Sequence, residues 1–206
     1  MREITFKIEE KQDGLMIRDF LRNFGVSSAL LTKLKRDENG ISLNGEFAKA
    51  IAVLHTSDVL KIRIKNKGKM PEKFICDKVK VAYDDEDILV LNKPPLMPVH
   101  ESRNHRGDTL ANVAACYMES DCAFRAVYRL DSDTSGLVLI SKNELAASKL
   151  AGKIKKDYYA IVKGKFEGEG TIDLPIRRVR ESIIERGVFD DGERAITHYT
   201  AIKTYG

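Results

Sequence analysis

The stretch Tyr128–Ile140, YRLDSDTSGLVLI, sets the arrangement of the second half of the chain. It runs into Leu137–Ser141, a continuous apolar segment of the kind that forms a strand buried on both faces. The residues before this segment are turn formers, whose hydroxyl and carboxyl groups can hydrogen-bond the local backbone. The sequence therefore predicts a turn that places Arg129 and Asp131 at the mouth of a buried strand.

Strand and helix patterns follow one another on both sides of this turn. The predicted strands are residues 78–83, 88–93, 137–141, 158–165 and 193–203, and the predicted helices are residues 108–120, capped by Asp108, and 143–154. Strands outnumber helices, and many of the joins between them are short turns. We therefore expect an α+β fold, a mixed and largely antiparallel sheet with flanking helices.

The first 65 residues predict a smaller module of their own. Apolar residues at helical spacing predict a helix over Leu15–Phe24 that ends at Gly25, and Ser27 or Ser28 can cap a second helix. A short strand between two Asn-Gly turns follows. Asp58–Lys65 then alternates apolar and basic residues, as a strand with one buried face does. The predicted order is helix, helix, hairpin and strand.

Composition excludes several classes of protein. The 206 residues are 43% hydrophobic, enough to build a core, so disorder is not expected. No apolar run is long enough to span a bilayer, and the charged N-terminus lacks a signal-peptide core. The three cysteines are widely spaced and form no CxxC pair. We therefore expect a cytoplasmic protein without a structural zinc site or a disulfide framework.

Positive charge is concentrated in the first third of the chain. Residues 1–70 hold 14 Lys and Arg against 9 Asp and Glu, whereas residues 71–206 hold 21 against 22. This asymmetry predicts an acidic partner for the N-terminal module, and nucleic acid is the usual one. A basic face that is merely solvated would give the same pattern.

The N-terminal module resembles the S4-type RNA-binding domain. The Ser-capped second helix, the SLNG turn and the closing strand SDVLKI match that domain in order and spacing over residues 13–65. The resemblance implies that structured RNA binds the second helix, where Lys33, Lys35 and Arg36 face outward. The alternative is a small capping domain with solvated lysines.

Four segments of the chain carry a second resemblance. They are ILVLNKPPLMPVH (Ile88–His100), YRLDSDTSG (Tyr128–Gly136), KDYYAIVKG (Lys156–Gly164) and AITHY (Ala195–Tyr199). In the same order they resemble the NKP-x-x-x-x-VH, HRLD-x-x-TSG, K-x-Y-x-A-x-V-x-G and A-x-T-x-Y segments of the RluA-type pseudouridine synthases. The resemblance implies an enzyme that isomerises chosen uridines of ribosomal or transfer RNA to pseudouridine.

The resemblance assigns three residues to this reaction. Asp131 is implied as the catalytic aspartate. The isomerisation needs one ionised carboxylate, as nucleophile or as base, and requires neither a cofactor nor a metal. Arg129 is implied as the residue that flips the target base out of the RNA stack, although an ion pair with Asp131 or Asp133 is the alternative. Tyr158 is implied to stack on the flipped uracil, although tyrosine is also ordinary in strands.

The loop before the predicted helix 108–120 adds candidate RNA contacts. Arg103 and Arg106 are placed to bind phosphates. His100 and His105 lie there without clustered acids, so we expect no metal site. The implied partner is structured RNA, ribosomal rather than transfer RNA, with no membrane and no small-molecule cofactor. Nothing in the sequence requires more than a monomer.

The chain departs from the family pattern in two places. Tyr128 stands where the family usually has His. The family's GR-x-HQIR segment, whose arginine pairs with the catalytic aspartate, does not follow AITHY, so we expect Asp131 to lack that charge partner.

We expect residues 1–65 to be an RNA-binding domain, 66–73 a linker, and 74–206 a catalytic domain that is incomplete at its C-terminus. The alternatives are a fragment or degenerate synthase that only binds RNA, and a synthase of the small-subunit class.

Overall fold

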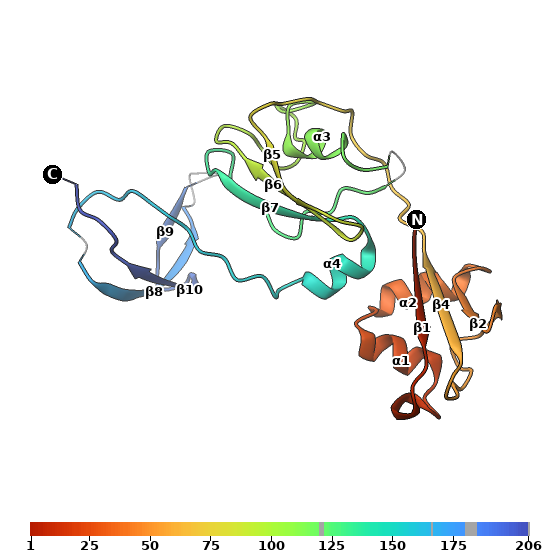
Figure 1. Cartoon of the computed structure of the whole chain (residues 1–206). Coiled ribbons are helices and arrows are strands. Elements are labelled where there is room, and N and C mark those ends of the chain that lie inside the picture. Colours follow the sequence, from red (N-terminus) through yellow and green to blue (C-terminus); the bar gives the residue numbers. More distant parts are fainter. Residues whose placement is uncertain (120–121, 166, 180–184, 206) are drawn as a thin grey trace. The chain divides into compact units, whose positions relative to one another are not determined.

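The computed structural model describes residues 1–119, 122–165, 167–179 and 185–205 (Figure 1). It separates into two compact units, Met1–Lys155 and Lys156–Gly206. The described strands pair antiparallel throughout, in three sheets rather than the single sheet that we expected. The fold is α+β, as predicted. None of the described helices has the length and apolar composition that crossing a membrane requires.

In chain order the elements are β1 (Arg2–Lys7), a 3-10 turn η1 (Glu10–Gln12), α1 (Ile17–Phe24), α2 (Ser28–Arg36), β2 (Ile41–Leu43), β3 (Glu46–Phe47), β4 (Val59–Ile64), β5 (Lys80–Asp84), β6 (Ile88–Lys93), α3 (Leu110–Ala114), β7 (Gly136–Ser141), α4 (Glu144–Leu150), β8 (Glu169–Arg178), β9 (Arg186–Val188) and β10 (Glu193–Thr200).

The N-terminal lobe, residues 1–65, packs α1 and α2 beside a four-stranded sheet of order β1-β4-β2-β3 (Figure 1). Helix α1 ends at Gly25, whose φ of +105° suits a residue without a Cβ atom. Ser27 caps α2 by accepting a hydrogen bond from Leu30 N at 3.2 Å. Both helices and the alternating strand β4 are confirmed, and together they bury one apolar cluster.

Strand β1 was not predicted, because charged residues dominate the start of the chain. Its inner residues nevertheless alternate, and Ile4 pairs with Ile62 while Phe6 pairs with Leu60 of β4. The ring of Phe6 meets Phe20 edge-on, with ring centroids 5.2 Å apart. Cross-strand and aromatic contacts of this kind fix β1 as an edge strand of the N-terminal lobe.

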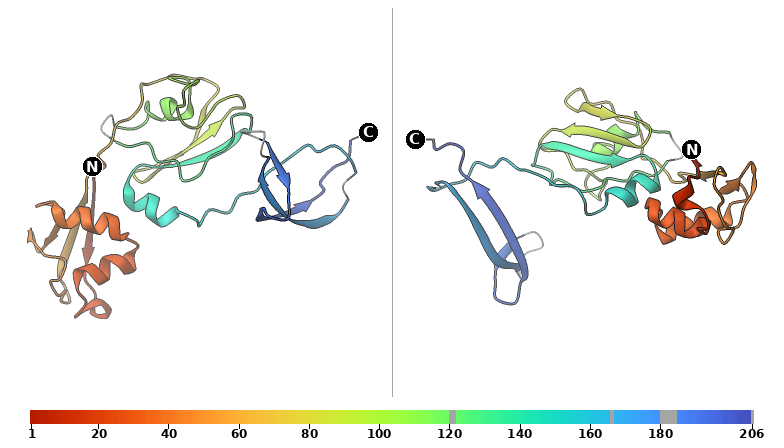
Figure 2. Two further views of the ribbon diagram at one scale, coloured as in Figure 1. Left: turned by 180° about the vertical axis from the view of Figure 1, so that it is seen from behind. Right: turned by 60° about the horizontal axis from the view of Figure 1, so that its bottom comes forward.

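The middle lobe, residues 66–155, contains the sheet β5-β6-β7, with α3 packed beside it in both views of Figure 2. Strand β7 was expected to be buried on both faces, and this is wrong: Val138 and Ile140 are buried, but Leu137 is 53% exposed. The face that carries Val138 and Ile140 packs into the apolar cluster of the middle lobe. On the opposite face, no described element covers Leu137 fully. The strand is therefore buried on one face.

Helices in the middle lobe are shorter than predicted. Helix α3 spans only five residues, and its N-cap is Thr109, which shares a capping box with Asn112, rather than Asp108. Ser120, the last residue of the predicted helix, lies outside the described residues. Residues 66–73 have no regular secondary structure, yet Asn66 and Met70 are buried. The domain boundaries at residues 65 and 74 stay predictions.

Helix α4 contributes to the core of the N-terminal lobe. Leu145 is 5% exposed and belongs to the cluster that α1, α2 and β4 build. Ser148 Oγ donates to Gly25 O at 2.9 Å, and Lys149 Nζ lies 3.5 Å from the centroid of the Phe24 ring. These contacts fasten the end of β7 to the N-terminal lobe.

The second unit is a three-stranded sheet of order β10-β8-β9. The strand predicted over Tyr158–Lys165 is wrong, because none of the described strands pairs with this segment. A strand needs hydrogen bonds from a neighbour, and alternation in the sequence cannot supply that neighbour. Strand β10 is confirmed, whereas β8 and β9 were not predicted. None of the described residues of this unit is buried.

We predict that Leu145→Ala lowers the free energy of unfolding by about 2–4 kcal/mol, because it opens a cavity in a packed cluster. Urea denaturation followed by far-ultraviolet circular dichroism measures this change. Leu137→Ala is the matched control, and its exposed position predicts a loss of about 0.5 kcal/mol or less. Equal losses for the two variants would contradict the assignment of Leu145 to the core.

Candidate active site

The aspartate loop, residues 128–135, joins two antiparallel segments of the first unit. Val127 N donates to Leu139 O at 2.8 Å, and Ser141 N donates to Arg125 O at 2.8 Å. The chain therefore runs beside β7, turns through the aspartate loop, and returns as β7. The loop is the tip of a wide hairpin, held by a strand that packs on the core.

Both ends of the aspartate loop are fixed. The Tyr128 hydroxyl donates to Leu137 O at 2.9 Å at its start. At its end Gly136 has a φ of +131°, which a residue with a Cβ atom rarely adopts. Between them Thr134 N donates to Asp131 O at 3.1 Å, and Asp131 is exposed. The loop thus presents the carboxylate from a constrained turn, and Tyr128 has a structural contact of its own.

A buried lysine ties the aspartate loop to the loop after β6. Lys93 pairs in register with Gly136, so both loops leave the sheet at the same edge. Lys93 is 1% exposed, and its Nζ donates to the carbonyl oxygens of Pro94 at 3.0 Å, Met97 at 2.8 Å and Ser132 at 2.9 Å. Met97 N also donates to Ser132 O, at 3.2 Å. Two of these four hydrogen bonds end on Ser132 O and so hold the residue next to Asp131 in place.

Sequence reasoning gave Lys93 no role, although the pattern of β6 contains a signal. The buried face of this strand carries Leu89, Leu91 and then Lys93. A lysine at an apolar position of a strand must find buried acceptors, because an unpaired ammonium group is costly to desolvate. The alternation therefore could have identified Lys93 as a buried cation.

The carboxylates of the aspartate loop affect the pKa of Lys93. Desolvation lowers the pKa of Lys93, and the carboxylates of Asp133 and Asp131 act in the opposite direction. Among the described residues Asp131 forms no ion pair. Lys93 is nevertheless a cation whose field reaches both carboxylates. Lys93 is therefore coupled electrostatically to the carboxylates of the aspartate loop.

Arg129 is exposed and is available to a ligand. Within the described part of the chain it forms no ion pair with Asp131 or Asp133, which was the alternative to a role in base flipping. Desolvation lowers the pKa of His100, and the nearby Arg129 cation lowers it further. The His100 ring meets Phe124 edge-on, with centroids 5.2 Å apart. Arg129, His100 and Phe124 therefore lie in one neighbourhood.

The remaining predicted residues belong to several different elements of the chain. Arg103 and Arg106 are exposed in the loop before α3. On α2, Lys35 and Arg36 are exposed, whereas Lys33 Nζ forms an ion pair with Glu144 Oε1 at 2.7 Å. His105 Nδ1 lies 2.9 Å from Asp108 Oδ2. Tyr158 belongs to the second unit and is 57% exposed.

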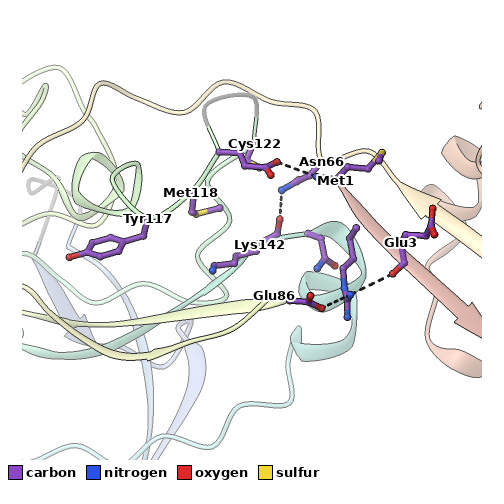
Figure 3. A pocket seen from close by; sticks show the side chains of 11 residues that line it. Met1, Glu3, Asn66, Glu86, Tyr117, Met118, Cys122 and Lys142 are labelled. Carbon is purple, nitrogen blue, oxygen red and sulfur yellow. Dashed lines mark hydrogen bonds and ion pairs between the residues drawn. The ribbon is translucent and has the colours of Figure 1, made fainter.

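A hollow of about 490 Å³ lies where the N-terminal and middle lobes meet (Figure 3). Its polar lining is largely paired: Arg2 forms ion pairs with Glu86 at 2.6 Å and Asp87 at 3.0 Å, and the N-terminal amine lies 3.1 Å from Glu119. Asn66 adds a hydrogen bond to the carbonyl of Lys142. No predicted site residue lines this hollow, so it is a junction between lobes and not the candidate active site.

We predict that Lys93→Met lowers the free energy of unfolding by about 2 kcal/mol, because buried carbonyl groups lose their donor. Urea denaturation measures the change. Lys80→Met, at an exposed position of the adjacent strand β5, is the control and is expected to change stability by about 0.5 kcal/mol or less. A Lys93→Met variant as stable as the parent would show that the ammonium group does not hold the loops together.

We predict that Arg129→Ala raises the pKa of His100, because it removes a cation that disfavours the protonated ring. Desolvation remains, so the pKa of His100 stays below its ordinary value. A proton NMR titration of the ring signal, assigned with a His100→Gln variant, measures the shift. Arg103→Ala should leave it unchanged, and a His100 pKa insensitive to Arg129→Ala would contradict the proposed neighbourhood.

Comparisons with known proteins agree with the second resemblance. Residues 87–205 match the family model described as RNA pseudouridylate synthase. The chain is 33% identical over 196 residues to the uncharacterized RNA pseudouridine synthase YjbO of Bacillus subtilis, which covers 90% of this chain and 69% of that protein. It is 38% identical over 136 residues to the ribosomal large subunit pseudouridine synthase D of Pseudomonas aeruginosa, covering 62% of this chain and 42% of that protein. The chain therefore belongs to the RNA pseudouridine synthase family.

Proposed function

We propose that this chain isomerises uridines of ribosomal RNA, with Asp131 as the catalytic aspartate. The observation that carries the proposal is the aspartate loop, which bears an exposed carboxylate and whose backbone is held by a buried lysine, through Ser132 O, and by a glycine at its end. A carboxylate acts well as a nucleophile or base when its position is fixed before the substrate arrives. The loop provides such a position for Asp131.

The proposed reaction is balanced without an added reagent. The N1–C1′ bond of uridine breaks, a C5–C1′ bond forms, the hydrogen at C5 leaves as a proton, and N1 gains a proton. Asp131 serves as the nucleophile or as the base in this exchange. No electrons are gained or lost overall, so we expect no cofactor.

Two further residues are proposed to handle the base. A uridine within an RNA stack must be flipped out before its C5 can be reached. Arg129 is exposed two residues before Asp131, and its planar guanidinium can stack on bases and pair with phosphate. Tyr158 takes the tyrosine position of the K-x-Y-x-A segment and is proposed to stack on the flipped uracil.

The N-terminal lobe is proposed to bind the RNA as an S4-type domain. Support comes from its two helices and closing strand, in the order that the resemblance requires. Lys35 and Arg36 are exposed on α2 and can contact phosphates, whereas Lys33 already has Glu144 as a partner. Arg103 and Arg106, exposed in the middle lobe, would extend the contact.

The proposed RNA is that of the large ribosomal subunit. The matched synthases of Pseudomonas aeruginosa and of two Buchnera strains are named for that subunit. Sequence identities of 35–38% to these proteins support a shared class of substrate. The proposal names the class of RNA and leaves the uridine open.

We predict that Asp131→Asn lowers the rate of isomerisation by at least about 100-fold, the usual minimum for losing a positioned acid–base or nucleophilic group. Release of tritium from RNA labelled at uracil C5 measures the rate, with large-subunit ribosomal RNA and transfer RNA as separate substrates. Asp133→Asn, an exposed carboxylate two residues away, is the control and should keep most of the activity.

Equal rates for the parent and Asp131→Asn would overturn the assignment of Asp131. A parent chain that binds RNA in a salt-dependent manner, but releases no tritium, would favour the alternative function of an RNA-binding protein without catalysis. Faster release from transfer RNA than from ribosomal RNA would overturn the proposed substrate.

A further inference from the structure

A second hollow, of about 850 Å³, lies in the middle lobe, and His100 lines it. We call it the His100 hollow. Three segments line it: residues 69–72, residues 100–107 with Ala111, and residues 123–124. Its volume is in the range of pockets that bind drug-sized or nucleotide-sized ligands.

The inner surface of the His100 hollow is apolar and aromatic. Met70, Pro71 and Phe124 line it, and the Phe124 ring meets the His100 ring edge-on at an interplanar angle of 74°. An unpaired RNA base can stack on an aromatic ring of this kind, whatever its identity. The surface therefore suits a flat ring.

The rim of the His100 hollow carries unpaired positive charge. Lys69 and Arg106 are exposed, and within the described residues neither forms an ion pair. Two carboxylates also line the hollow. Glu101 accepts hydrogen bonds on Oε1 from Gly107 N at 3.2 Å and Asn112 Nδ2 at 3.0 Å, and Glu72 is exposed. Among the described residues neither carboxylate forms an ion pair with Lys69 or Arg106, so both cations remain available to an anionic group at the entrance.

A backbone contact links the His100 hollow to the aspartate loop. Met97 N donates to Ser132 O at 3.2 Å, Ser132 is next to Asp131, and the same segment reaches His100, which lines the hollow, three residues after Met97. A strand of RNA whose uridine lies at Asp131 would therefore pass its neighbouring nucleotide over this hollow.

We propose that the His100 hollow binds an unpaired nucleotide next to the flipped uridine, its base against Phe124 and its phosphate at Arg106 and Lys69. The inference rests on the proposed function, because it takes RNA to be the substrate. It adds a site for a flanking nucleotide, which neither the motifs nor the family match assigns.

The test measures binding of a fluorescein-labelled decauridylate to the full chain by fluorescence anisotropy. Phe124→Leu keeps apolar bulk but removes the ring, and Arg106→Ala and Lys69→Ala each remove one rim charge. Phe124→Leu is expected to weaken binding about tenfold, the size of one lost base stack. Each rim variant is expected to weaken it about fivefold, as the loss of a charge-assisted hydrogen bond does.

Lys80→Ala is the matched control, because it removes an exposed lysine of the same lobe that does not line the hollow. We expect it to weaken binding less than about twofold, as diffuse electrostatics alone predicts. Equal losses for Lys80→Ala and Lys69→Ala, or unchanged binding by both Phe124→Leu and Arg106→Ala, would overturn the inference. Arg106 and Lys69 are exposed, so their variants remain informative if Phe124→Leu does not fold.

Tritium release by the same preparations separates this inference from the proposed function. In one outcome, tritium release depends on Asp131 while the hollow variants bind and react like the parent. That result would reject the nucleotide site in the His100 hollow and support the proposed catalytic function. If the parent releases no tritium but the hollow variants bind more weakly than Lys80→Ala, the nucleotide site stands and catalysis by this chain fails.

Discussion

The ammonium group of Lys93 is the interaction on which the candidate active site depends. It is desolvated, and it is stable in the core only while three carbonyl oxygens surround it. One of these belongs to the aspartate loop and two belong to the loop after β6. Neither loop can move alone without leaving a buried charge short of acceptors. The cost of that state restricts both loops, and hence Asp131, to one arrangement.

The sheet supplies the geometry that makes this interaction possible. Strands β6 and β7 are antiparallel neighbours, so the end of one lies at the start of the other, with Lys93 opposite Gly136. A cation at the last buried position of β6 can then reach the turn that feeds β7. The site thus combines a rigid sheet edge with loops that carry the functional groups.

Local patterns in the sequence were sufficient for part of this structure. Helices α1 and α2, strands β4, β6 and β10, and the turn at Asp131 follow from periodicity, caps and turn residues, all of which act over a few residues. The errors lie where pairing is distant: β1 depends on β4, and the segment Tyr158–Lys165 has no described partner. Asp131 and Arg129 came from motifs, whereas Lys93 was missed because lysine is usually assumed to face solvent.

The position of Leu145 in the chain affects the order in which parts of the protein fold during synthesis. The N-terminal lobe includes this residue in its core, although about eighty positions separate it from the last strand of that lobe. During synthesis the first 65 residues leave the ribosome well before Leu145 does. The nascent lobe then exposes the apolar surface that α4 later covers, and its final packing waits for the middle of the chain. Maturation of the proposed RNA-binding end is thereby coupled to synthesis of the aspartate loop, which precedes α4.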